Sequence, residues 1–168
     1  MKTAKKLLIC IFLAVATLLV FASCVDKPQA KQLTDLTLPT LRGNQAAVII
    51  KNGDNDYTSY TVNIAKVGSG DNLTAEDVLV YLKDEAELTL DWTDSDFGKF
   101  INAIGGITPN ANNREYVAVF TSNPKYQGTW AGVDTYEVGN VSLVAANYGV
   151  SELGVVAGDI VYFELASY

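Results

Sequence analysis

Residues 46–64, with the sequence AAVIIKNGDNDYTSYTVNI, decide the fold because they predict a β-hairpin. The first part, residues 46–51, is rich in β-branched side chains, which favour a strand. The Asn-Gly step that follows is typical of a tight turn, since these residues tolerate positive φ angles. Residues 57–64 alternate as a returning strand does. The alternation places three side chains on one face of this strand: Tyr60, Val62 and Ile64.

The segment after the hairpin predicts one clear helix over residues 75–86. Thr74 stands three residues before Asp77, which is the spacing of an N-cap with an acidic residue in the first turn. Apolar residues then recur at helical spacing and predict a buried face: Val78, Leu79, Leu82 and Ala86.

The rest of the chain predicts strands and loops without a second clear helix. A hairpin, one helix and scattered strands predict an α+β fold, a mixed sheet packed on one main helix, in the order of a β-grasp. The predicted segments are a short strand at 88–90, an acidic irregular loop at 91–99, an apolar segment at 100–107, strands at 115–121 and 141–144, a loop at 126–139 and a closing strand at 158–165.

The start of the chain carries an export signal. Three lysines precede an apolar run from Leu7 to Phe21, which is shorter than the roughly 20 residues of a spanning helix. The end of this run, FASC at residues 21–24, resembles the lipobox of bacterial lipoproteins. The resemblance implies cleavage before Cys24 and acylation of its thiol and new amine. An ordinary signal peptide or an uncut membrane anchor remains the alternative.

These features divide the chain into three parts. We expect a signal peptide at 1–23, a lipidated cysteine with a flexible tether at 24–45, and one domain at 46–168. The tether prediction rests on its prolines and scattered polar residues. The protein would be exported and lipid-anchored at the cell envelope, on the extracytoplasmic side, because several acyl chains hold a protein far better than one.

Composition excludes several classes of chemistry. The chain has no histidine and only two cysteines, Cys10 and Cys24, and the first of these leaves with the signal. A disulfide within the mature chain, a zinc site of His and Cys, and a Ser–His–Asp triad are therefore excluded. The net charge of −7 disfavours nucleic acid as a partner, so we expect contact with the membrane through the lipid anchor alone.

Four motifs in order resemble the transcobalamin-like C-terminal domain family. They are TAEDVL at 74–79, FINAIGGI at 100–107, EYVAVFTSN at 115–123 and VAGDIVYF at 156–163. The resemblance covers residues 46–168 and implies a β-grasp-like domain. In vertebrate carriers this domain covers one side of a bound corrinoid together with a helical barrel, which this sequence lacks. We therefore expect no cofactor, with a corrinoid and calcium as the options left open.

Three acidic residues, Asp91, Asp94 and Asp96, lie close together beside Trp92 and Phe97. Neighbouring carboxylates are hard oxygen ligands that suit Ca²⁺, and a carboxylate pair also serves acid–base catalysis. A solvated acidic loop explains the same pattern. Because no other catalytic motif is present, we expect a protein that is not an enzyme.

A second group of candidates is aromatic. Tyr126, Trp130 and Tyr136 lie in one glycine-bearing loop, and flat rings with polar tips suit a sugar, a planar ligand or a protein surface. Alternatively, Trp130 folds inward and closes the end of the sheet. The leading hypothesis is a binding module for a small planar ligand, a glycan or a protein partner. The second is an adhesion or assembly accessory that pairs through a sheet edge, and a carboxylate-based enzyme ranks third.

Overall fold

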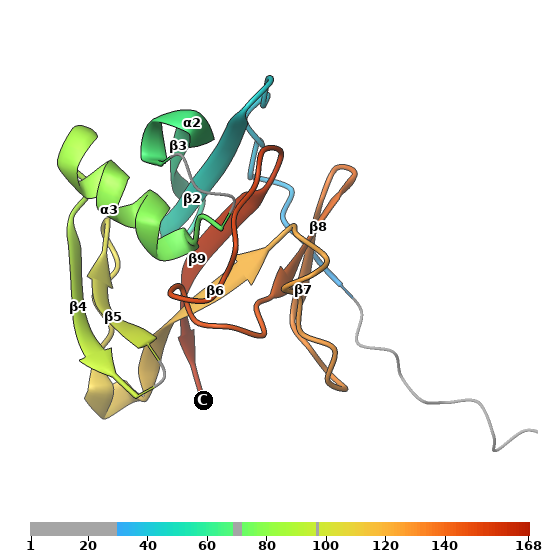
Figure 1. Cartoon of the computed structure of the whole chain (residues 1–168). Coiled ribbons are helices and arrows are strands. Elements are labelled where there is room, and N and C mark those ends of the chain that lie inside the picture. Colours follow the sequence, from blue (N-terminus) through green and yellow to red (C-terminus); the bar gives the residue numbers. More distant parts are fainter. Residues whose placement is uncertain (1–29, 69–71, 97) are drawn as a thin grey trace, which may run out of the picture.

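The computed structural model describes residues 30–68, 72–96 and 98–168 (Figure 1). The signal segment and Cys24 lie outside these residues. Within them, a seven-stranded mixed sheet has the order β1-β7-β8-β6-β9-β2-β3, and β4 and β5 form a separate two-stranded sheet. The elements are β1 (Lys31–Gln32), β2 (Gln45–Gly53), β3 (Asp56–Asn63), α2 (Ile64–Val67), α3 (Ala75–Glu85), β4 (Leu90–Ser95), β5 (Gly98–Ile104), the 3₁₀ turn η1 (Ala111–Asn113), β6 (Glu115–Thr121), β7 (Thr135–Val138), β8 (Val141–Ala145) and β9 (Ile160–Ser167).

The predicted hairpin is confirmed as β2 and β3, which pair antiparallel from Gln45↔Asn63 to Gly53↔Asp56. On its other side β2 pairs parallel with β9. Because β2 has a strand on each side and both of its faces are covered, residues 46–50 are all apolar and all buried. Their side chains alternate between the two hydrophobic clusters on opposite faces of the sheet, Val48 in one and Ile49 in the other.

The predicted helix is confirmed as α3, and its start has the expected cap. The Thr74 hydroxyl accepts from the backbone N–H of Asp77, and the Asp77 carboxylate accepts from the backbone N–H of Thr74 at 2.8 Å, which completes a capping box. The buried side of α3 contributes Val78, Leu79 and Leu82 to the same cluster as Val48 and Phe163 of the sheet. The α+β class is therefore confirmed.

The acidic loop predicted at residues 91–99 is wrong, because most of this segment forms the β4–β5 hairpin. Leu90 pairs with Ile104 and Trp92 with Ile101, with a register shift between Asp91 and Trp92. The shift breaks the simple alternation by which a strand is recognised in a sequence. The buried residues Leu90, Ile101 and Ile104 hold this hairpin against α3 and the large sheet.

The flexible tether predicted up to residue 45 differs from the structure, because the packed fold begins at Lys31. The short strand β1 pairs parallel with β7, and Leu36 is only 6% exposed. Leu33, Leu38 and Leu41 pack against the same cluster. The helix side of the sheet has α3 as its cover, whereas the opposite face needs other apolar side chains. Residues 31–41, which we call the strap, lie on this face beside β7 and β8 (Figure 1).

The loop predicted at residues 126–139 contains a strand that the sequence did not reveal. Thr135–Val138 forms β7, which pairs antiparallel with β8 and places Tyr136 opposite Leu143. Four residues are too few to show an alternating pattern. The strands predicted at 115–121, 141–144 and 158–165 are confirmed as β6, β8 and β9.

Candidate functional site

The three aromatic residues predicted as one binding surface lie in different environments. Tyr136 is buried in the cluster beneath the strap, whereas Tyr126 packs against the cluster beneath α3. Trp130 is 48% exposed and its ring lies over Gly128, which leaves no space there for a side chain. The ring of Tyr126 meets Tyr148 edge-on, with centroids 5.8 Å apart. The structure therefore does not bring the three rings together into one site.

Tyr136 belongs to a buried polar group with Glu164 and Tyr162. The Tyr136 hydroxyl donates to Glu164 Oε1 at 2.6 Å and the Tyr162 hydroxyl to Glu164 Oε2 at 2.9 Å. Burial raises the pKa of both tyrosines, and the neighbouring Glu164 carboxylate raises it further. Both phenols thus remain protonated donors that satisfy a buried carboxylate.

The three acidic candidates lie on the β4–β5 hairpin with separate partners. Asp94 pairs with Lys99 at 2.5 Å, and the ammonium of Lys99 also lies 5.6 Å from the centroid of the Trp92 ring. Asp91 accepts from the side-chain amide of Asn102 at 3.2 Å, and Asp96 is exposed near the hairpin turn. Among the described residues, no three His, Cys, Asp or Glu side chains are grouped so that they could hold a metal ion.

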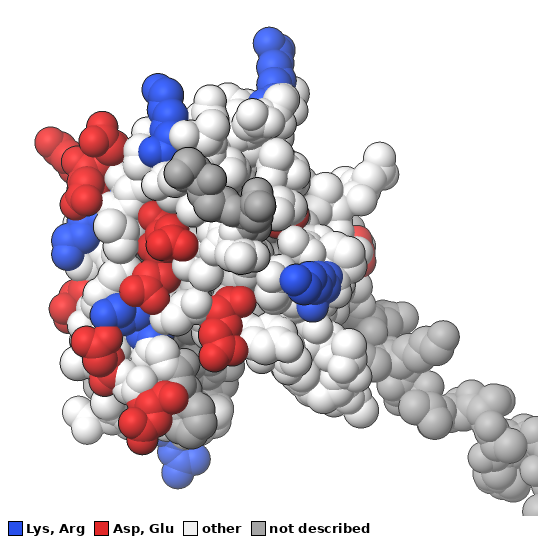
Figure 2. All heavy atoms as spheres, viewed as in Figure 1, with Lys and Arg blue, Asp and Glu red and all other residues white. Residues whose placement is uncertain are grey.

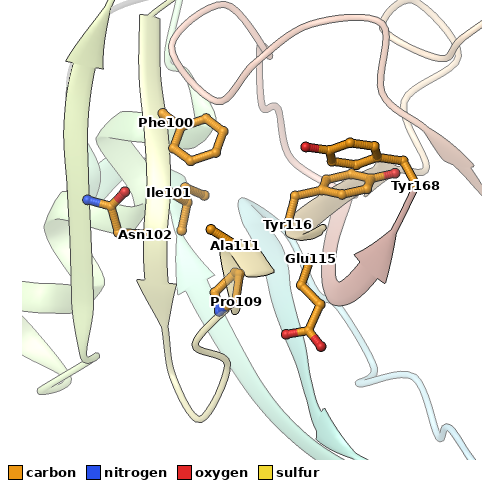
Figure 3. A pocket seen from close by; sticks show the side chains of 8 residues that line it. All are labelled: Phe100, Ile101, Asn102, Pro109, Ala111, Glu115, Tyr116 and Tyr168. Atoms are coloured by element: carbon orange, nitrogen blue, oxygen red, sulfur yellow. The ribbon is translucent and has the colours of Figure 1, made fainter. Parts of the chain in front are cut away.

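A different group of aromatic residues lines a hollow of about 550 Å³ between the two sheets. One wall is β5 and the other is the start of β6 with the residue after β9, while the segment around η1 lies between them (Figure 3). The rings of Tyr116 and Tyr168 lie next to each other, across the hollow from Phe100 (Figure 3). We call this hollow the ring pocket; its lining includes Phe100, Ile101, Pro109, Glu115, Tyr116 and Tyr168.

Strand pairing explains how two tyrosines 52 positions apart in the chain meet at the pocket. In the antiparallel pair β6–β9, Tyr116 lies opposite Ala166, and the backbone N–H of Tyr168 donates to the carbonyl of Arg114 at 3.3 Å. The ring centroids of Tyr116 and Tyr168 are consequently 6.0 Å apart, with planes inclined by 47°. This inclined geometry is favourable for an aromatic pair.

Glu115 holds the segment around η1 in place at the pocket. Its carboxylate accepts from the backbone N–H of Asn110 at 2.8 Å and from the side-chain amide of Asn113 at 3.1 Å. These bonds hold η1 against β6, with Arg114 in the left-handed conformation (φ 55°) that turns the chain between them. Glu115 is the one charged side chain among the lining residues.

The surface around the pocket is exposed and largely apolar. Phe100 is 57% exposed, Tyr116 36% and Tyr168 81%, so the three rings together form an exposed aromatic patch around the pocket. Acidic side chains gather instead on the part of the surface that α3 and the β4–β5 hairpin form (Figure 2). The pocket itself is lined mostly by apolar and aromatic side chains.

Sequence reasoning missed this site because its rings come from three distant segments. The single signal was the excess of aromatic residues over what one core needs. The chain has 9 Tyr and 6 Phe, and alternation along β6 puts Tyr116 on the opposite face from its neighbours.

No family model and no curated protein matches the chain. Among solved structures, a candidate metal-binding protein from Ruminococcus gnavus matches 75% of this chain and 99% of its own length, with 15% identity and a TM-score of 0.48. Haptocorrin in complex with Cbi matches 79% of this chain, with 13% identity and a TM-score of 0.48. The match spans 27% of the length of haptocorrin. Likenesses at this level say nothing about a ligand of the present chain.

None of the described helices is both long and apolar enough to cross a bilayer.

Proposed function

We propose that this protein is an exported, lipid-anchored binding module, with a β-grasp-like domain that holds a small ligand in the ring pocket. The lipobox-like sequence ending at Cys24 supports export and anchoring to the cell envelope. The ring pocket supports binding, and it is the single observation on which the function rests.

The size and lining of the pocket suit a small molecule. A hollow of about 550 Å³ lies within the roughly 300–1,000 Å³ of ligand sites. Phe100 offers a ring on one wall and Tyr116 and Tyr168 on the other, and such rings supply large contact areas with little loss of conformational freedom. A ligand that enters between them is contacted from both walls.

A thermal-shift screen of the chain from Val25 onward tests this function. Neutral and acidic sugars, corrinoids, haem and Ca²⁺ form the probe set. A ligand at 100 times its dissociation constant stabilises the folded state by about 2.7 kcal/mol. We expect the stabilisation to be lost in Phe100→Ala and kept in Trp130→Ala, since Trp130 is exposed outside the pocket. If no probe shifts the midpoint, or if Phe100→Ala leaves every shift intact, the proposed site is wrong.

The anchor has its own test at Cys24. Cells fed an alkyne-bearing palmitate analogue should label the wild-type protein, and the Cys24→Ala variant should stay unlabelled. Mass spectrometry of the wild-type protein should then find an acylated cysteine at the start of the mature chain. An unmodified thiol, or a leader still attached, contradicts the anchoring proposal.

A second candidate function, assembly through a sheet edge, rests on β3. This eight-residue strand stands at the end of the large sheet, where β2 is its one partner among the described strands. An edge of this length is a template for another strand. Sedimentation analysis across a range of concentrations tests this candidate. Assembly should appear as a growing mass, and a constant monomer at all concentrations argues against it.

A further inference from the structure

The lining of the ring pocket restricts the charge of its ligand. Among the described residues that line it there is no lysine or arginine, and the one charged side chain is Glu115. The whole chain is also acidic, with a net charge of −7. A phosphate, sulfate or carboxylate group would therefore find no cation to pair with and would be repelled by Glu115. This argument disfavours an anionic ligand.

The openness of the pocket restricts the ligand further. The hollow is open to solvent on one side rather than enclosed, so a molecule held between Phe100 and Tyr168 keeps part of its own surface in water. Typical small-molecule pockets bury roughly 70–90% of a drug-sized ligand. An open, ring-lined site suits instead a molecule with one apolar face and a hydrated remainder.

A sugar ring has this combination of surfaces. Its axial C–H groups form an apolar face that contacts an aromatic ring, and its equatorial hydroxyls point outward to water or to polar side chains. The pocket presents Phe100 on one wall and the inclined pair Tyr116 and Tyr168 on the other, at 47° to each other. The Tyr168 hydroxyl points toward the side of the hollow on which Phe100 lies and offers a hydrogen bond there (Figure 3).

We propose that the ring pocket binds a neutral oligosaccharide, with sugar faces packed against Phe100 and the Tyr116–Tyr168 pair. This inference rests on the proposed binding function and names its ligand class. The remainder of the saccharide extends into solvent from the open side of the pocket. Anionic polysaccharides and flat apolar molecules are the classes that the pocket disfavours.

Isothermal titration calorimetry tests the inference on the chain from Val25 onward, which lacks the leader and the lipidated cysteine and retains every described residue. The neutral probes are maltohexaose, cellohexaose, xylohexaose, mannohexaose and chitohexaose. Hexagalacturonic acid represents the anionic class and Nile red the flat apolar class. At least one neutral hexasaccharide should bind, and neither of the other two probes should compete with it.

Matched variants locate the binding. Phe100→Ala and Tyr168→Ala should each weaken the saccharide about tenfold or more, because each removes a ring from the contact. Tyr168→Phe keeps the ring and should retain most of the affinity, and Trp130→Ala should bind as the wild type does. Both truncated side chains are more than half exposed, so their variants should fold with unchanged circular dichroism.

The outcomes separate this inference from the broader function. Binding of hexagalacturonic acid or Nile red alone, lost in Phe100→Ala, overturns the neutral-saccharide inference and leaves a binding module. Saccharide binding that survives both ring truncations also overturns it, because the site then lies elsewhere. If none of these probes binds, the neutral-saccharide inference is also overturned. The proposed binding function itself fails only if the thermal-shift screen finds no ligand either.

Discussion

The strap gives the sharpest test of the fold, through the substitution Leu36→Ala. Leu36 is 6% exposed and packs in the hydrophobic cluster beneath the strap, on the face of the sheet opposite α3, with Ile49 and Tyr162. Buried Leu→Ala changes cost about 2–5 kcal/mol, the larger values where the cavity stays open. The strap lies at the surface and can settle inward, so we expect the lower part of that range, about 2–3 kcal/mol.

Chemical denaturation and a thermal scan measure this effect. A change of 1 kcal/mol shifts the melting temperature of a domain of this size by about 3 °C, so Leu36→Ala should lower it by about 6–9 °C. The matched control is Thr37→Ala, since Thr37 is the next residue in the strap and is exposed. If both variants unfold at the same midpoint, residues 31–41 are the flexible spacer that the sequence suggested, and the placement of Leu36 in the core is refuted.

Three further predictions concern other parts of the domain. Thr74→Ala removes the cap of α3 and should destabilise by about 1 kcal/mol in urea unfolding, whereas Thr74→Ser keeps the hydroxyl and should cost little; equal losses would rule out the cap as the cause. The pKa values of the buried Tyr136 and Tyr162 are raised, which leaves the free energy of unfolding unaffected below the ordinary tyrosine pKa of 10.0. Above this pH the unfolded chain loses phenol protons that the folded chain retains, so stability should fall as the pH rises. Urea midpoints that stay level between pH 8 and pH 11 contradict this. Gly154→Ala would place a methyl group against the ring and hydroxyl of Tyr126 and should cost about 1–3 kcal/mol, a penalty that should largely disappear in a Tyr126→Ala background.

The elements read correctly from the sequence are those with strong local signals. The hairpin β2–β3 has a β-branched run and an Asn-Gly turn, and α3 has a cap followed by an apolar stripe. In both cases the information lies within a few neighbouring residues, so the pattern and the structure agree. The class of fold follows from their order along the chain.

The elements that were missed depend on distant partners. The β4–β5 hairpin has a register shift and acidic residues, and β7 has four residues, so neither shows a clear period. The leucines of the strap are unevenly spaced and indicate no regular element. They become buried because they pack against the face of the sheet opposite α3. Each of these segments becomes ordered through contacts with residues far away in the sequence.

The predicted sites differ from the structural site for the same reason. Tyr126, Trp130 and Tyr136 are near in sequence, yet β7 turns Tyr136 into the core beneath the strap while Trp130 stays outside. Proximity along a chain does not imply a shared face, because neighbouring residues of a strand point to opposite sides.

The amino-acid sequence by itself determined the α+β class and which side chains are available for chemistry, and it carries the resemblance on which the proposal of export and lipid anchoring rests. These depend on which residues are present and on their short-range spacing. Only the tertiary structure decided where the ring pocket lies, because Phe100, Tyr116 and Tyr168 meet through the packing of two sheets and the register of β6 with β9. A pocket is a property of surfaces brought together by folding, and no local stretch of the chain contains it.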